Sequence, residues 1–367
     1  MRTILITASD VRAIVDRMGL NAIMDENIRR IHEAFRDYDP SRVQVSVRDG
    51  FRYTYPHVGL LEMMPVRVPG GAATIKIVGY HPANPKLRVL PTILATVAVF
   101  EAESGHLTGL IDGTFLTALR TAATSAVASK HLASPRSETL GLIGCGGQSV
   151  AQLHALSRVF ELKRVLTYDL VPERAASVAA RASRFCSPSL DIRPVPLHEL
   201  VATADIICTQ TSVGVGEGPV FEDGVTRPHL HVNAVGADLP NKFEIPLALL
   251  KRSLVVPDFP AQTALEGECQ RLEPADIGPS LIEIVQNPEL GAAARDRTTV
   301  FDSTGFALED HVTAAQLFEY AREAGVGTTI DMECTSPDPF DPYGFVDPPS
   351  SAAPPVGRSR LQVDRAE

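Results

Sequence analysis

The sequence has little positive charge and no basic run. Its 367 residues carry 34 Lys and Arg against 44 Asp and Glu, which gives a formal net charge of -10 and a pI near 5.5. Nucleic-acid binding depends on clustered cations that neutralise phosphates. This charge balance argues against a nucleic-acid partner.

Long apolar runs are also missing. The longest, from Val89 to Phe100, is interrupted by Pro91, Thr92 and Thr96 and is too short to cross a bilayer. The first residues, Met1 to Ile4, lack the apolar core of a signal peptide. We therefore expect no membrane partner and a soluble, cytoplasmic protein.

Cysteines are few and scattered. The five cysteines stand at positions 145, 186, 208, 269 and 334, without a Cys-x-x-Cys pair or a Cys/His ligand spacing. A disulfide framework and a structural zinc site both need such patterns. We expect neither a disulfide framework nor a metal site.

What is present starts with a strand, a tight turn and a helix. The apolar run Leu140 to Ile143 stops at closely spaced glycines, Gly144 and Gly146, before an amphipathic segment over 150–160. Glycine allows a close backbone approach, so a pyrophosphate could sit against the helix N-terminus. Ser149 stands where the dinucleotide fingerprint has Gly or Ala, so an ordinary β-turn-α unit also fits.

A second strand-like run strengthens the nucleotide interpretation. Residues 163–169 end in Asp169, 25 residues after Gly144, where such folds place the carboxylate that binds a ribose. The alternative is an Asp that caps the helix starting near Pro172. Further buried strands are expected at 205–209 and 231–236. The pattern predicts an α/β, Rossmann-type dinucleotide-binding domain.

The region before this domain has a different pattern. Helical spacing of apolar residues predicts helices over 10–18 and 21–37. From Val43 to Gly113 short strands alternate with turns, including a hairpin turn at Glu103 to Gly105. We expect an α+β substrate-binding domain built on antiparallel strands.

Two further helices connect the domains. An Ala-rich and Leu-rich segment, 114–133, carries the chain from the first domain to the second, and a helix over 307–325 returns. We assign 126–310 to the NAD-binding domain. We expect residues 1–125 with 311–335 to form a discontinuous substrate-binding domain, and 336–367 to form a Pro-rich tail in which Tyr343 and Phe345 are candidate anchors.

Three cations stand in settings unusual for surface charges. Arg48 precedes a turn, Lys76 lies within an apolar strand, and Arg120 lies in the Ala-rich helix. A cation among apolar neighbours is unfavourable unless it is paired, which makes these residues candidates for a carboxylate site. The alternative is structural ion pairing, for example with Glu62 or Asp112.

Asp238 is a candidate for proton transfer. It follows a strand end, and loops at the carboxyl ends of parallel strands line the ligand crevice. Burial would raise its pKa toward the useful range, while the three cations would oppose that shift. The alternative is an Asp that caps the segment after Pro240. Ser303, before the last helix, could bind a nicotinamide or cap that helix.

Several motifs together resemble the ornithine cyclodeaminase/mu-crystallin family, in the family's order from about residue 8 to 330. They are Leu119–Ala123, Asn233–Asp238 with Lys242 and Glu244, Glu266–Glu268 and Phe301–Ala307. Within the family, the stretches at 77–85, 211–219 and 341–343 are most similar to bacterial lysine cyclodeaminases of natural-product pathways.

The resemblance implies roles for the site residues. Arg48, Lys76 and Arg120 would hold the substrate α-carboxylate, Asp238 would transfer protons, and Glu62 would lie near the substrate amine. The cofactor would be NAD. Its expected contacts are Thr121, Gly144, Gly146, Gly147, Gln148, Asp169, Thr209, Ser212, Lys242 and Ser303.

The resemblance also implies a reaction and an assembly. L-lysine would lose hydride from Cα to NAD, the distal amine would attack the imine, ammonia would leave, and the cyclic imine would be reduced to L-pipecolate. Conversion of L-ornithine to L-proline, cyclic-imine reduction, amino-acid dehydrogenation and a non-catalytic, mu-crystallin-like binding role remain as alternatives. The family implies a homodimer formed through the antiparallel domain.

Overall fold

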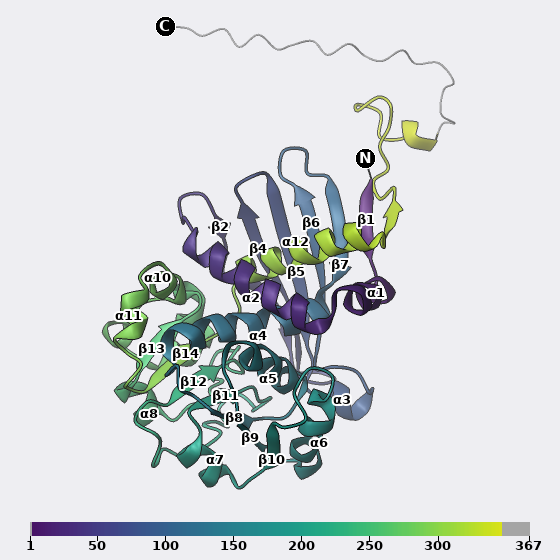
Figure 1. Ribbon diagram of the computed structural model, residues 1–367. Coiled ribbons are helices and arrows are strands. Elements are labelled where there is room, and N and C mark those ends of the chain that lie inside the picture. Colours follow the sequence, from purple (N-terminus) through teal and green to yellow (C-terminus); the bar gives the residue numbers. More distant parts are fainter. Residues whose placement is uncertain (1, 347–367) are drawn as a thin grey trace, which may run out of the picture.

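Two sheets and the helix between them organise the computed structural model, which describes residues 2–346 (Figure 1). The first sheet has the strand order β15-β1-β7-β6-β5-β4-β2, with β3 paired to β4. Its strands are β1 (Thr3–Ile6), β2 (Gln44–Val45), β3 (Asp49–Tyr53), β4 (Gly59–Val68), β5 (Ala72–Tyr80), β6 (Ile93–Glu101), β7 (Leu107–Asp112) and β15 (Thr328–Ile330).

Pairing from β2 to β7 is antiparallel, which confirms the expectation for residues 43–113. Two strands of this sheet were not predicted. The strand β1 pairs in parallel with β7, and β15 pairs antiparallel with β1. Both are only three or four residues long, which is too short for an alternating pattern to stand out.

Three helices lie over one face of this sheet (Figure 1): α1 (Ala8–Met18), α2 (Leu20–Arg36) and α12 (Ala307–Ala324). Their bounds confirm the predicted helices within a few residues. The helix α12 packs against β4 and β5, while α1 and α2 pack against α12. Ile14, Ile23, Ile31 and Phe35 from α1 and α2 are fully buried in this core.

The second sheet is entirely parallel, with the order β10-β9-β8-β11-β12-β14-β13. Its strands are β8 (Thr139–Ile143), β9 (Arg164–Tyr168), β10 (Asp191–Pro194), β11 (Ile206–Thr209), β12 (His231–Ala234), β13 (Leu254–Pro257) and β14 (Thr299–Asp302). Four central strands, β8, β11, β12 and β14, are buried along their whole length. The predicted Rossmann-type sheet is confirmed.

Short helices surround the parallel sheet or follow its strands. They are α5 (Gly147–Val159), α6 (Pro172–Ala182), α7 (Leu197–Thr203), α8 (Leu247–Arg252), α9 (Pro260–Glu266), α10 (Leu281–Gln286) and α11 (Pro288–Ala292). The remaining short elements are α3 (Asn84–Leu87) and the 3-10 turns η1 (Glu268–Arg271), η2 (Pro274–Asp276) and η3 (Gly344–Val346). No helix among residues 2–346 is long and apolar enough to cross a membrane.

The helix α4 (Gly113–Leu132) joins the two sheets (Figure 1). It packs against α2 and β6 on one side and against α5, β12 and β14 on the other. Asp112 caps it, because the carboxylate accepts hydrogen bonds from the backbone N–H groups of Thr114 at 3.2 Å and Phe115 at 2.9 Å. Asp112 is therefore a helix cap, and the structural ion pairs that were the alternative for Lys76 and Arg120 are present with Asp310 and Glu309 instead.

The described part of the tail does not pack on the body through its aromatic residues. Tyr343 is 76% exposed and Phe345 is 44% exposed. The prediction that these two side chains anchor the tail was wrong. The rest of the predicted tail, 347–367, lies outside the described residues.

Candidate active site

A buried ion cluster lies where β5, α4 and the start of α12 meet. Lys76 Nζ is 2.8 Å from the Asp310 carboxylate. Arg120 Nη1 lies 3.0 Å from Glu309 Oε2, and Arg120 Nε lies 3.1 Å from Asp310 Oδ1. The predicted structural partner Glu62 is not part of this cluster. The two acids of the cluster, Glu309 and Asp310, both lie in the first turn of α12.

The cluster is buried, and three of its polar atoms have no hydrogen-bond partner. Burial, followed by the neighbouring Arg120 guanidinium, lowers the pKa of Lys76 to about 7 although Asp310 opposes the shift. Burial likewise raises the pKa of Glu309 to about 8. Arg120 Nε, Glu309 Oε1 and Asp310 Oδ2 are buried and have no hydrogen-bond partner. Two cations with spare donor capacity suit a ligand carboxylate.

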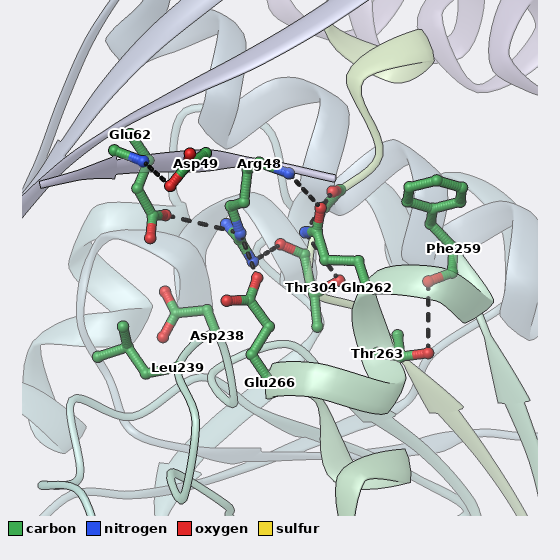
Figure 2. Close-up of polar contacts among 12 residues, drawn as sticks. Arg48, Asp49, Glu62, Asp238, Leu239, Phe259, Gln262, Thr263, Glu266 and Thr304 are labelled. Atoms are coloured by element: carbon green, nitrogen blue, oxygen red, sulfur yellow. Dashed lines mark hydrogen bonds and ion pairs between the residues drawn. The ribbon is translucent and has the colours of Figure 1, made fainter. Parts of the chain in front are cut away.

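Arg48 lies in a second cluster, between the two halves of the molecule (Figure 2). Its Nε pairs with Glu266 and lies 3.6 Å from Glu62 Oε2, while its Nη2 donates to the Thr304 carbonyl at 2.7 Å. The Arg48 side chain is 7% exposed. Arg52, which the sequence did not single out, lies 3.0 Å from Glu62 and 3.1 Å from Glu266. Burial raises the pKa of Glu266.

Asp238 follows β12 and faces the same cluster (Figure 2). Its carboxylate acts electrostatically on both Arg48 and Glu266. Lys242 Nζ lies 2.7 Å from Asp238 Oδ1 and 4.8 Å from the centre of the Tyr80 ring. Although burial opposes it, the Asp238 charge raises the pKa of Lys242. Asp238 therefore pairs with a buried ammonium, and it makes no capping hydrogen bond after Pro240.

Two buried glutamates shape the loops around Asp238. Glu244 accepts hydrogen bonds from the backbone N–H of Thr211 at 2.6 Å and of Gly236 at 2.9 Å, which ties the loops after β11 and β12 together. Glu268 in turn accepts from the Glu244 N–H at 2.6 Å. Sequence motifs included both acids without giving them this role. Only the strands' spatial order brings their amide partners together.

The Ser303 segment is held from the side by Asp258. This carboxylate accepts from Ser303 Oγ at 3.1 Å, from Thr304 Oγ1 at 3.3 Å and from the Gly305 N–H at 2.6 Å. A Cβ at Gly305 would come within 2.9 Å of the Arg120 guanidinium, so glycine is needed for the close packing. The N-cap of α12 is the following residue and has no side-chain cap bond. The prediction that Ser303 caps this helix was wrong.

The glycine turn between β8 and α5 leaves open space over the helix N-terminus. Gly144 has a φ of 88°, a conformation that favours glycine. Gly146 is the N-cap of α5 without a side-chain cap bond, and a Cβ at Gly146 or Gly147 would meet nothing within 4 Å. Gln148 Oε1 is buried without a partner. These free amides and this space fit a dinucleotide pyrophosphate.

Asp169 and Arg181 hold the turn in place. Asp169 accepts from the Cys145 N–H at 2.7 Å and from the Val171 N–H at 2.8 Å. The N-cap of α6 is Val171 and has no side-chain cap bond, so the predicted capping alternative for Asp169 was wrong. Arg181, absent from the sequence-based site, donates to the carbonyls of Cys145 at 2.8 Å and Gly146 at 3.1 Å.

Other predicted cofactor residues lie at the carboxyl ends of strands or beside the ion cluster. Thr209 is the last residue of β11, and its buried Oγ1 has no hydrogen-bond partner. Ser212 is exposed in the following loop. Thr121 is buried on α4 next to Arg120. Thr209 and the glycine turn thus lie at the carboxyl ends of β11 and β8, whereas Thr121 lies beside Arg120 on α4.

Comparisons with known proteins agree with this arrangement. The model of the ornithine cyclodeaminase/mu-crystallin family matches residues 8–325. An L-lysine cyclodeaminase from Streptomyces rapamycinicus is 40% identical over 346 residues, which cover 94% of this chain and 100% of that protein.

Solved structures give the same picture. A lysine cyclodeaminase, whose structures concern recognition of L-lysine, L-ornithine and L-2,4-diamino butyric acid, has a TM-score of 0.91 and 44% identity, covering 94% of this chain and 100% of its own. An archaeal alanine dehydrogenase dimer with bound NAD has a TM-score of 0.77 and 29% identity, covering 91% and 100%. The resemblance of the sequence motifs is confirmed, and the chain belongs to the ornithine cyclodeaminase/mu-crystallin family.

Proposed function

We propose that this protein is a lysine cyclodeaminase that converts L-lysine to L-pipecolate and ammonia with NAD as a recycled cofactor. The observation that carries the proposal is a pair of clusters with opposite preferences. Lys76 and Arg120 offer buried cations with spare capacity for a carboxylate, and Glu62 with Glu266 offers buried carboxylates for an ammonium. The 40% identical lysine cyclodeaminase supports this substrate.

The buried cluster of Lys76 and Arg120 with Glu309 and Asp310 would bind the α-carboxylate of the substrate. Lys76 and Arg120 are 0% and 5% exposed, so their charge is poorly screened by water. Asp310 and Glu309 keep the two cations oriented before the substrate arrives. Preorganised charges of this kind bind without reorganisation and hold the reacting Cα in one place.

Asp238 would be the proton-transfer group. Its side chain is 24% exposed and within reach of both the buried ions and solvent, and Lys242 holds it by an ion pair of 2.7 Å. A carboxylate so placed can accept a proton from a substrate ammonium and return it as ammonia leaves. Holding the distal amine near the reacting carbon makes ring closure an intramolecular step.

NAD would be held at the edge of the parallel sheet. The amides near Gly146, Gly147 and Gln148 would bind its pyrophosphate, and Asp169 would bind its ribose. Bound NAD supplies a reversible hydride acceptor next to the substrate. The acidic Asp169, followed by Leu170 and Val171 without a cation, favours NAD over NADP, because a carboxylate repels a 2′-phosphate. Titration showing tighter binding of NADP than of NAD would contradict this preference.

The outer face of the antiparallel sheet supports a homodimer. The side chains of Phe51, Leu61, Met63, Ile77 and Leu94 lie on β3 to β6 and are between 39% and 72% exposed. A contiguous apolar surface of this kind marks an association site. The alanine dehydrogenase with a TM-score of 0.77 is a dimer. We propose that two copies pair through this face.

The division into domains follows from the same arrangement. We propose that 1–125 with 311–335 form the substrate-binding and dimerisation domain and that 126–310 form the NAD-binding domain.

The five cysteines form no disulfide, which supports a reducing compartment such as the cytoplasm.

Ornithine is the main competing substrate, since the family name includes ornithine cyclodeaminase and the lysine cyclodeaminase of known structure also recognises L-ornithine. The test is to incubate the purified protein and NAD with each diamino acid and to separate the products by chromatography. Pipecolate from L-lysine at a higher kcat/KM than proline from L-ornithine supports the proposal. The reverse ratio would assign the ornithine reaction, and the absence of both products would favour a binding role.

A further inference from the structure

Arg52 on β3 occupies an unusual position between two buried acids. Its Nε and Nη2 donate to Glu62 Oε1 at 3.2 and 3.0 Å, and its Nη2 also donates to Glu266 Oε2 at 3.1 Å. The Arg52 side chain is 45% exposed, whereas Glu62 and Glu266 are 2% and 4% exposed. A solvated guanidinium therefore sits on two desolvated carboxylates, one from each half of the molecule.

The neighbouring Arg48 differs from Arg52 in how firmly it is held. Arg48 is 7% exposed and is fixed by Glu266, Glu62 and the Thr304 carbonyl. Among residues 2–346, the side-chain hydrogen bonds of Arg52 go only to the two acids, and its exposed side can return to water. Ion pairs of exposed side chains are weak because water competes for the charge and the side chain loses rotamer freedom. Of the two arginines, Arg52 is the exchangeable one.

The register of β4 and β5 sets the distance from these acids to the carboxylate site. Met64 pairs with Lys76 and Glu62 pairs with Val78, so Glu62 and Lys76 are diagonal neighbours on the same buried face. Diagonal neighbours in an antiparallel pair are about 7–8 Å apart. That separation is comparable with the length of an extended diamino acid. A substrate whose carboxylate reaches Lys76 can place its distal ammonium at Glu62 and Glu266.

We propose that Arg52 occupies the place of the substrate's distal ammonium in the free enzyme and is displaced by it. This proposal rests on the proposed function and deepens it. The exchange conserves charge, because one cation leaves the two acids as another arrives. An amino acid without a distal amine brings no replacement, so displacing Arg52 would leave two buried carboxylates to share the single cation Arg48. Arg52 would therefore select diamino acids against monoamino acids.

The test compares L-lysine with L-norleucine, which has the same chain length but no distal amine. Isothermal titration of the full-length protein with NADH in place of NAD, so that the first hydride transfer cannot occur, gives both dissociation constants for the parent and for Arg52→Gln. We expect the value for L-lysine to fall roughly threefold or more, because the competing guanidinium is gone. The value for L-norleucine should not fall. An unchanged or increased dissociation constant for L-lysine would overturn the proposal.

Two further variants keep the test decisive. Arg29→Gln is a matched control, because Arg29 is 52% exposed and also bridges two acids, Glu26 and Glu33, but lies on α2. It should change neither constant. If Arg52→Gln does not fold, Arg52→Lys retains the charge with poorer geometry for two carboxylates, and should strengthen L-lysine binding by a smaller factor. No strengthening in that variant would also overturn the proposal.

The binding data separate this proposal from the proposed reaction. If L-lysine binding strengthens in Arg52→Gln but the parent forms no pipecolate, the reaction is wrong and the role of Arg52 stands. If the parent forms pipecolate and L-lysine binding does not strengthen, only the role of Arg52 is wrong.

Discussion

Two neighbouring residues of β5 have exposures opposite to those expected from their chemistry. Lys76 is charged and 0% exposed, while Ile77 is apolar and 49% exposed. The same inversion recurs on β4, where Glu62 is 2% exposed and its neighbours Leu61 and Met63 are 43% and 45% exposed. Successive side chains of a strand point to opposite faces, so Glu62 and Lys76 share the buried face with apolar residues such as Met64 and Val78, while Leu61, Met63 and Ile77 share the exposed face.

The difference shows what each face is for. The inner face is covered by α12 and α4, which bring Asp310 and Arg120 against Lys76, so its charges are held away from water. Buried charge is unfavourable for stability unless it is paired, and we propose that here it serves substrate binding. On the outer face, the apolar side chains of Leu61, Met63 and Ile77 stay 43–49% exposed among residues 2–346, and we propose that they pack on a second copy. Charged side chains are therefore buried among apolar ones on the inner face, while apolar side chains are exposed on the outer face.

The largest expected effect comes from Asp238, which follows β12 and faces the cluster of Arg48, Glu62 and Glu266. Asp238→Asn keeps the shape and removes the base, so turnover of L-lysine should fall by roughly two to four orders of magnitude, the scale of a lost acid-base group. NAD affinity should change little. Steady-state rates and NAD titration check both points. A folded variant that turns over L-lysine near the parent rate would show that another residue moves the proton.

The second prediction tests whether the buried Lys76–Asp310 ion pair stabilises the fold. Lys76→Met leaves Asp310 buried without its 2.8 Å ammonium partner, and removing one member of a buried pair destabilises a protein by about 3–5 kcal/mol. Urea denaturation measures the loss, which should be accompanied by weaker binding of L-norleucine. Lys86→Met, at a position away from the cluster on α3, is the control. An unchanged free energy of unfolding in Lys76→Met would mean that Asp310 is neutral or solvated.

The outer face should respond in the opposite way. Ile77→Glu places a charge on the proposed dimer surface without touching the inner cluster, so the monomer should keep its fold and lose its partner. Light scattering at micromolar concentration should show a monomer for the variant and a dimer for the parent. Circular dichroism should show no change. A parent that is monomeric would remove the dimer proposal.

The smallest expected effect is a pH dependence of stability and of carboxylate binding. It concerns the inner face, where the Lys76 ammonium titrates near neutrality. The pKa of Lys76 is lowered from 10.5 to about 7, so between these values the unfolded chain holds more protons and the Lys76 contribution to stability rises with pH. Carboxylate binding has the opposite sign, since it needs the ammonium.

The dissociation constant of L-norleucine should therefore rise above pH 7, by up to about tenfold per pH unit. Titrations between pH 6 and pH 8.5 measure it. Lys76→Arg stays charged and should flatten the profile. A flat profile in the parent would mean that Lys76 remains protonated throughout.

The residues that the sequence identified are those whose neighbours along the chain were already informative. Lys76 stood out within an apolar strand, and Gly144 and Gly146 marked a turn between a buried strand and a helix. Local patterns of this kind depend on periodicity and turn chemistry, which act over a few residues. For the same reason the antiparallel and parallel regions were predictable.

The partners of those residues were not predictable, because they are remote in the sequence. Asp310 is 234 residues from Lys76, and Glu266 is 214 residues from Arg52. On α12 the expected core positions Val312, Ala315 and Tyr320 are only half-buried, whereas Leu317 is buried as expected. Glu309 and Asp310 of α12 point inward and pair with the buried cations Lys76 and Arg120. The apolar pattern of the helix does not reveal this pairing.

The most direct test of the central claim follows the two nitrogens of the substrate. L-lysine labelled with ¹⁵N at the α-amine is incubated with the protein and NAD, and ammonia and pipecolate are analysed by mass spectrometry. We expect the label to leave entirely as ammonia, pipecolate to be unlabelled, and no NADH to accumulate. Label retained in pipecolate, or NADH formed in proportion to product, would contradict the central claim.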